Sequence, residues 1–126
     1  MSRLLIIGAG GFVGAILRYW VSGWVQRWLN NADFPYGTLV VNLSGCLIIG
    51  VFSYLTEGGW VSPELRSFAM IGILGAFTTF STFSNETLAL LRDGENLPAF
   101  ANVTTHIVLG LGAAWAGRVL AALIWR

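Results

Sequence analysis

Charged side chains are scarce in this sequence: they make up 10% of its 126 residues, whereas hydrophobic residues make up 56%. A soluble globular domain usually carries about 25% charged residues. So few charges cannot form the polar shell that a soluble fold of this length needs, and the mean hydropathy of +0.72 points the same way. The composition therefore predicts an integral membrane protein whose surplus of apolar side chains faces lipid.

Two further residue types are almost or wholly missing. All seven cations are arginine and none is lysine, and the net charge of +1 gives no basis for binding nucleic acid. Cys46 is the single cysteine, which excludes an internal disulfide and a cysteine-based metal cage. Because no nucleophile–base pair or metal cluster stands out either, we predict that the chain is not an enzyme and acts on no organic substrate.

Four apolar runs are each about 20 residues long, the length that crosses the hydrocarbon core of a bilayer. They extend over about 4–25, 37–56, 67–91 and 99–123. The short separators between them are rich in proline, glycine and asparagine, which favour turns. We therefore predict an all-α membrane protein with one domain, residues 1–126, of four transmembrane helices. The first run is interpreted as a retained helix, because it is too long for the core of a typical signal peptide.

The arginines give an unusual topology signal. Four spans place both termini and the second loop on one side of the membrane. That side holds Arg3, Arg66, Arg118 and Arg126, and the other side holds Arg18, Arg27 and Arg92. Proteins of fixed topology usually concentrate their cations on the cytoplasmic side. The near balance leaves two interpretations open: insertion in both orientations, which permits an antiparallel dimer, or a bias that so few arginines understate.

Small residues recur in the predicted helices. Gly10 and Gly14 form a small-xxx-small pair in the first span, and glycines continue through the other spans. Such residues let helix backbones approach closely in lipid. The pattern is compatible with self-association, since four short helices cannot easily enclose an aqueous path, and equally with tight packing inside one subunit.

The third span holds a dense cluster of polar side chains. Its members are Thr78, Thr79, Ser81, Thr82, Ser84, Asn85 and Glu86. Polar groups at membrane depth are costly unless they are paired or face a water-filled cavity. Threonine, serine and the flexible Gly75 also weaken a helix, so we predict an interruption within 75–79. Carbonyls freed at such a break are able to hold a cation.

Two aromatic residues lie inside this cluster. Phe80 and Phe83 are three residues apart and share one face of a helix, and Ser81 and Ser84 share a neighbouring face. The edge of an aromatic ring carries partial positive charge. Two ring edges beside hydroxyl donors suit a small anion that must bind weakly enough to be released. The alternative is that both Phe side chains serve only packing.

Other polar residues fall inside the remaining spans. Asn42 lies in the second span, where its amide serves either the same pathway or helix–helix contact. Asn102 and His106 are four residues apart on one face of the fourth span. Arg18 is a full charge within the first span. It snorkels to the interface, pairs with Glu86, or attracts anions at a vestibule, and the composition does not choose among these.

The sequence resembles the Fluc (CrcB-type) family of small fluoride channels over nearly its whole length. The resemblance includes GGFVGAILRY at 10–19 and PYGTL at 35–39, which leads to Asn42 and Gly45. The most specific part is TTFSTFS at 78–84 together with Glu86.

This resemblance implies an assembly that the composition does not show. It implies an antiparallel, dual-topology homodimer with two parallel fluoride pathways and a broken third helix. A structural sodium ion is then expected at the dimer centre, bound by backbone carbonyls at Gly75 and Thr78. The implied role is passive export of cytoplasmic fluoride by a multi-pass protein embedded in the lipid of the bacterial plasma (inner) membrane.

The resemblance also implies roles for individual residues. The fluoride pathway is expected to include Phe80, Phe83, Asn42, Ser81, Thr82, Ser84, Asn102 and His106, with Arg18 and Glu86 as vestibule or structural charges. Two positions depart from the family pattern. Ala76 stands where a second glycine usually follows Gly75, and His106 occupies a variable position, where its charge near neutral pH is a candidate influence on conduction.

Two other functions remain open from the sequence. A small multidrug transporter also has four short spans and dual topology, but it needs a carboxylate inside the membrane, usually in the first span. Here the first span carries Arg18 instead, and Glu86 is the only candidate. A non-conducting scaffold or assembly factor is the second alternative, and it has no need of the hydroxyl cluster.

Overall fold

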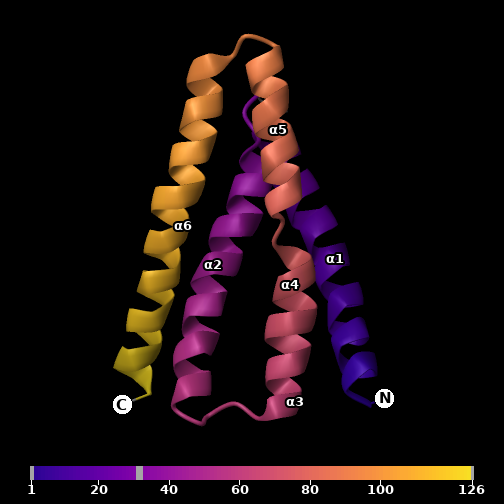
Figure 1. Cartoon of the computed structure of the whole chain (residues 1–126), viewed down its shortest axis with the longest axis vertical. Coiled ribbons are helices and arrows are strands. Elements are labelled where there is room, and N and C mark those ends of the chain that lie inside the picture. Colours follow the sequence, from indigo (N-terminus) through magenta and orange to yellow (C-terminus); the bar gives the residue numbers. More distant parts are fainter. Residues whose placement is uncertain (1, 31–32, 126) are drawn as a thin grey trace.

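Long helices run along the whole molecule (Figure 1). In chain order the elements are α1 (Ser2–Trp28), α2 (Tyr36–Glu57), α3 (Pro63–Arg66), η1 (Ser67–Leu74), α4 (Gly75–Phe77), α5 (Phe80–Arg92) and α6 (Asn96–Ile124). This computed structural model describes residues 2–30 and 33–125, and within those ranges it contains no strand. α1, α2, the segment Pro63–Arg92 and α6 are each long and apolar enough to cross a membrane. The prediction of four transmembrane helices is confirmed.

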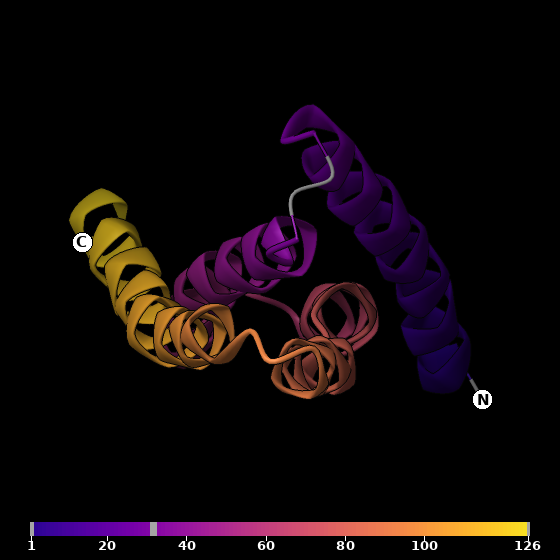
Figure 2. The same ribbon diagram turned by 90° about the horizontal axis from the view of Figure 1, so that it is seen from above.

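The ends of the spans alternate between the two ends of the molecule. The N- and C-terminal ends and the α2–α3 connection lie at one end, and the α5–α6 connection lies at the other (Figure 1). α2 packs chiefly along α6, and α1 packs chiefly against η1. Seen from above, α1 and α6 lie on opposite sides of α2 and the interrupted third span (Figure 2). The arrangement of termini and loops agrees with the sidedness predicted from four spans.

Glycines permit close contacts between the helices. A methyl group added at Gly14 in α1 would overlap the carbonyl of Ile73 in η1, and one added at Gly50 in α2 would overlap the carbonyl of Ala114 in α6. Backbones approach this closely only where no Cβ intervenes. The glycine pair of the first span therefore packs within one chain, which is the intrachain alternative left open by the sequence.

The third span is interrupted between α4 and α5. It begins at a serine cap, where the Ser62 hydroxyl accepts a hydrogen bond from the Leu65 amide at 3.2 Å. Thr78 (φ −80°, ψ 155°) and Thr79 (φ −152°, ψ 111°) have extended backbones, whereas Gly75 remains helical (φ −62°, ψ −33°). The predicted interruption is confirmed and is located at its two threonines.

Large apolar side chains cover much of the outside of the molecule. Leu4, Phe12, Phe100, Leu111 and Trp115 are examples that are each at least 69% exposed. Trp24 and Trp28 stack near one end of α1, with ring centroids 6.0 Å apart. An apolar exterior with tryptophans near the helix ends is typical of spans whose outer faces contact lipid and whose aromatic residues lie at the membrane interface.

Candidate functional site

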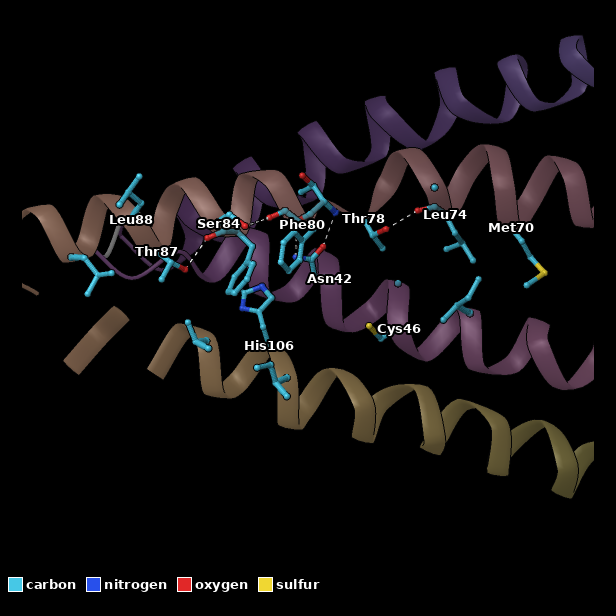
Figure 3. A pocket seen from close by; sticks show the side chains of 18 residues that line it. Asn42, Cys46, Met70, Leu74, Thr78, Phe80, Ser84, Thr87, Leu88 and His106 are labelled. Carbon is cyan, nitrogen blue, oxygen red and sulfur yellow. Dashed lines mark hydrogen bonds between the residues drawn. The ribbon is translucent and has the colours of Figure 1, made fainter. Parts of the chain in front are cut away.

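A groove of about 790 Å³ lies beside the helix break, between α2, the two halves of the third span and α6 (Figure 3). We call it the central groove. Its polar lining consists of Asn42, Cys46, Thr78, Thr79, Ser84, Thr87 and His106. Phe80, Phe83 and aliphatic side chains make up most of the rest, together with Gly45 and Gly75. The groove is thus an apolar cleft with polar groups gathered near the break, which is the usual composition of a ligand pathway.

Asn42 holds the broken backbone in place. Its Nδ2 donates to the carbonyl of Thr79 at 3.1 Å, and its Oδ1 accepts from the Thr79 amide at 2.8 Å. The donor and acceptor on the backbone fix the orientation of the side-chain amide. In a continuous helix the Thr79 amide would donate to the carbonyl of Gly75. Because Asn42 takes this donor instead, the Gly75 carbonyl loses its helical partner.

Thr79 begins the second half of the span. Its hydroxyl oxygen accepts from the Thr82 amide at 3.2 Å, which is a typical helix N-cap, and its hydroxyl donates to Thr82 Oγ1 at 2.9 Å. Thr79 was not among the site residues predicted from the sequence. The signal was available, since a threonine that opens a helical run is a favoured cap. Thr79 therefore stabilises the helix break in two ways: its backbone is held by Asn42, and its side chain caps α5.

The two phenylalanines contact each other and reach α6. The ring centroids of Phe80 and Phe83 are 5.3 Å apart, and those of Phe83 and His106 are 4.3 Å apart. Phe83 is 8% exposed, whereas Phe80 is 79% exposed at the edge of the groove. The predicted shared face is confirmed. Three rings from α5 and α6 therefore form one continuous wall of the central groove.

A chain of hydrogen bonds connects α5 to α6 beside this wall. The Thr87 hydroxyl donates to the Phe83 carbonyl at 2.8 Å and accepts from Asn102 Nδ2 at 2.9 Å. Asn102 is fully buried, and its backbone carbonyl oxygen lies 2.9 Å from His106 Nδ1. Asn102 and His106 are therefore joined as their spacing suggested, but only His106 lines the groove. Thr87, which the sequence analysis missed, is the residue that ties Asn102 to α5.

Glu86 lies away from the central groove. The Thr38 hydroxyl donates to one of its carboxylate oxygens at 2.7 Å, and the other oxygen is buried with no partner among the described residues. Both residues line a second cavity, of about 460 Å³, whose other acidic members include Asp33, Asp93 and Glu95. Thr38 was not predicted as a site residue, although it precedes Asn42 by one helical turn and so shares its face.

Arg18 lines a third cavity, of about 430 Å³, together with Thr79 and Thr82. Within the described ranges the one ion pair joins Arg118 to Glu57, so the proposed pairing of Arg18 with Glu86 is not present there. The half-buried Arg18 lies beside the hydroxyls that cap α5. This position favours the vestibule alternative over an internal ion pair.

The remaining residues predicted for the pathway and the sodium site lie partly in the lining of the central groove and partly outside it. Gly75 and Thr78 both line the central groove, as does Ser84, whose hydroxyl donates to the Phe80 carbonyl at 2.9 Å. Ser81 is exposed on α5, with its oxygen 3.4 Å from that of Thr79. The structure thus gathers Asn42, Phe80, Phe83, Ser84 and His106 of the predicted pathway on one groove. Ser81, Thr82 and Asn102 lie outside its lining, and Thr82 lines the third cavity instead.

Comparison with known proteins identifies the family to which this chain is similar. Residues 5–118 match the family described as "CrcB-like protein, Camphor Resistance (CrcB)". A protein of Rhodospirillum rubrum named fluoride-specific ion channel FluC is 45% identical over 123 residues, which are 95% of this chain and 95% of that protein. Fluoride-specific ion channel FluC 1 of Methanosarcina acetivorans is 44% identical over 122 residues, covering 96% of this chain and 92% of that protein.

A third relative differs in length. The protein of Methylococcus capsulatus named fluoride-specific ion channel FluC is 46% identical over 119 residues, which are 94% of this chain but 52% of that protein. The chain therefore spans about half the length of this relative. The four spans and these relatives confirm the predicted location as a multi-pass bacterial membrane protein. The match over most of the sequence confirms the resemblance found there: the chain belongs to the CrcB-like family.

Proposed function

We propose that the chain is a subunit of a fluoride-selective channel that releases cytoplasmic fluoride passively. The names of its relatives support this role, since each is a fluoride-specific ion channel. Membership of this family gives the chain a transport function rather than an enzymatic one. The structural observation that carries the proposal is the break at Thr78–Thr79, which Asn42 clamps beside the Phe80–Phe83 pair.

The groove offers chemistry that suits a small, strongly hydrated anion. Fluoride must exchange its water for other hydrogen-bond donors step by step. The hydroxyls of Ser84 and Thr87 now donate to backbone carbonyls one turn earlier, and a rotation of the side chain frees either proton. Ring edges of Phe80 and Phe83 add weak positive potential without a full charge. Weak donors of this kind permit entry without trapping the ion.

The Arg18 cavity supplies attraction outside the groove. Thr82 Oγ1 accepts from Thr79, so its own proton is available to that cavity, where Arg18 adds a full positive charge. A cation at the mouth of a low-dielectric path raises the local anion concentration. We assign Arg18 to a vestibule and Glu86 to a structural role with Thr38.

The functional unit is proposed to be an antiparallel homodimer with two pathways. Phe80 is 79% exposed at the rim of the central groove, and the broken backbone at Thr78 and Thr79 borders the same groove. Lipid cannot satisfy irregular backbone, which persists in a membrane only where protein or water covers it. A second copy inserted in the opposite orientation covers this face, and the balanced arginines permit that orientation.

A sodium ion fits the break as a structural partner. The donor set consists of backbone carbonyl oxygens at Gly75 and Thr78, the kind of oxygen that freed backbone offers to sodium. The Gly75 carbonyl has lost its helical donor to Asn42, and Gly75 itself is exposed. Bound between two copies, the ion would add positive charge where two pairs of helix ends meet.

Fluoride efflux from liposomes tests the proposed function. The purified protein is expected to release fluoride rapidly, measured with a fluoride electrode, and to release little chloride. Phe80→Ile is expected to lose most of the flux, while Phe100→Ile, at an exposed position of α6 that does not line the groove, keeps it. Folded dimer that releases no fluoride would refute the channel and return the transporter and scaffold alternatives.

A further inference from the structure

His106 is fixed in one tautomer by its own helix. Its Nδ1 lies 2.9 Å from the carbonyl oxygen of Asn102. A carbonyl oxygen only accepts hydrogen bonds, so Nδ1 must carry a proton in this geometry. The neutral ring then presents Nε2 as a bare lone pair. Any second proton has one place to bind, which is Nε2.

The Nε2 atom is buried and has no hydrogen-bond partner among the described residues. The ring lines the central groove and contacts Phe83, with centroids 4.3 Å apart (Figure 3). Protonation would therefore place a new N–H donor and a positive charge just beneath the groove wall, and a small shift of the ring would bring the donor to the groove surface. The neighbouring Phe83 ring gives such a cation a favourable contact inside the membrane.

The groove near His106 has no competing charge in the described part of the chain. Its lining includes one other titratable side chain, Cys46 on α2. On α5, Glu86 lines the separate 460 Å³ cavity and Arg92 ends the helix. At the far end of α2, Glu57 is paired with Arg118 of α6. Protonation of His106 thus adds a charge to a groove whose other described side chains are neutral.

Two unpaired acceptor atoms lie close to this site. Among the described residues, the buried side-chain atoms without a partner are Asn102 Oδ1 and His106 Nε2 here and Glu86 Oε2 in the separate 460 Å³ cavity. The Asn102 assignment is firm, because the Thr87 hydroxyl donates to a carbonyl and must accept from Nδ2. His106 and Asn102 therefore present acceptors here while the imidazole is neutral. An anion gains nothing from acceptors, but it gains a charge-assisted hydrogen bond from a protonated Nε2.

We propose that Nε2 of His106 is an anion-binding position of the central groove that forms only when the imidazole is protonated. The inference rests on the proposed fluoride channel, and it deepens that function by making the affinity for fluoride depend on pH. Acid then strengthens fluoride binding in the groove. At low fluoride concentration conduction rises, because entry is limiting. At saturating fluoride it falls, because a tighter site releases the ion more slowly.

The first test observes the protonation of His106 directly. The chain contains one histidine, so protein labelled with ¹³C-histidine and carrying a histidine-free tag gives a single ring signal in NMR. Linkage requires that an anion bound by the protonated form raise the titration midpoint. Fluoride in place of an equal concentration of gluconate is expected to raise it by roughly 0.7 pH units, a fivefold coupling at the low end of typical values. An unchanged midpoint would overturn the inference.

The second test measures conduction in planar bilayers, where neutral hydrogen fluoride carries no current. Lowering the pH from about 7.5 to about 5.5, across the usual titration range of histidine, is expected to reduce the half-saturating fluoride concentration about fivefold. His106→Gln is expected to abolish this shift, and Asn85→Ala, at an exposed position of α5 outside the groove, is expected to retain it.

The outcomes separate the two proposals. Fluoride current whose half-saturation does not change with pH, or a shift that persists in His106→Gln, overturns the inference and leaves the channel intact. Absence of fluoride current at every pH overturns the proposed function, and with it the inference.

Discussion

At the scale of single residues, the polar side chains of this protein bind backbone more than one another. Asn42 pairs with both polar atoms of Thr79, while Ser84 and Thr87 bond to carbonyls one turn earlier. These contacts satisfy groups that lipid cannot. Asn42 is the most consequential, because among the described residues it is the one that hydrogen-bonds to the break from another helix.

Asn42→Ala is predicted to destabilise the protein and to stop conduction. The substitution leaves the buried amide and carbonyl of Thr79 unpaired, at a cost of about 1–3 kcal/mol for each group. Thermal unfolding in detergent and fluoride efflux measure the two effects. The matched control is Asn85→Ala at an exposed position of α5, which is expected to shift stability by less than about 0.5 kcal/mol. Equal stability of the two variants would contradict the role given to Asn42.

The Thr38–Glu86 hydrogen bond makes a second prediction at this scale. Thr38→Val leaves the half-buried carboxylate with no donor from α2 and is expected to cost about 1 kcal/mol. Glu86→Gln is expected to lower the free energy of unfolding less in the Thr38→Val background than in the wild type. A double-mutant cycle in thermal unfolding should therefore show coupling. Additive effects would show that the bond is incidental.

Glu86→Gln also separates a channel from a proton-coupled exchanger. Fluoride efflux is expected to continue in this variant, because the proposed pathway uses no proton transfer at Glu86. Complete loss of transport in folded Glu86→Gln protein would revive the exchanger alternative.

At the scale of the elements, the two halves of the third span and the tight α2–α6 contact define the site. The sequence allowed the four spans to be predicted within a few residues, since apolar length is a local property. It also predicted the interruption, because threonine and serine weaken a helix wherever they cluster. The location at Thr78–Thr79 was not predictable in the same way. It depends on Asn42, a residue 37 positions earlier in the chain.

The difference between local patterns and contacts with distant residues also explains which site residues were predicted. Asn42, Phe80, Phe83 and His106 were identified and do meet on the central groove. The roles of Thr38, Thr79 and Thr87 were missed, because each depends on a partner in another helix or on the backbone geometry of the break. Spacing along one helix predicts a shared face, but it does not predict what lies opposite that face.

The α2–α6 contact predicts a difference between two glycines. Gly50→Ala is expected to destabilise the protein by about 1–3 kcal/mol, because its methyl group overlaps the carbonyl of Ala114. Gly112→Ala, in α6 with no atom near its added Cβ, is expected to be neutral or to stabilise by up to about 1 kcal/mol. Thermal unfolding of both variants checks this, and a Gly50→Ala variant as stable as Gly112→Ala would refute the close packing.

At the scale of the whole molecule, one chain leaves the proposed pathway incomplete. The central groove is open, and Phe80 is exposed at its edge. The proposed antiparallel partner closes the groove and covers the broken backbone. Each half of the dimer would then contribute one pathway, and the sodium ion would lie where the two breaks meet.

Dual topology is directly measurable. In a Cys46→Ala background, Glu95→Cys places a thiol in the exposed α5–α6 connection. If both orientations insert equally, a membrane-impermeant maleimide added outside intact cells should label roughly half of the protein. Labelling of nearly all or nearly none of it would establish a single orientation and refute the antiparallel dimer.

The current carried by single channels under a fluoride–chloride gradient tests the central claim most directly. Fluoride is placed on one side of a planar bilayer and chloride on the other. A passive fluoride-selective channel then gives a current whose reversal potential is far from zero and has the sign of the fluoride equilibrium potential. The wild-type protein is expected to show that reversal, and the Asn42→Ala variant is expected to carry no such current. A wild-type current that reverses near zero, or that follows chloride, would contradict the account of the groove as a selective fluoride pathway.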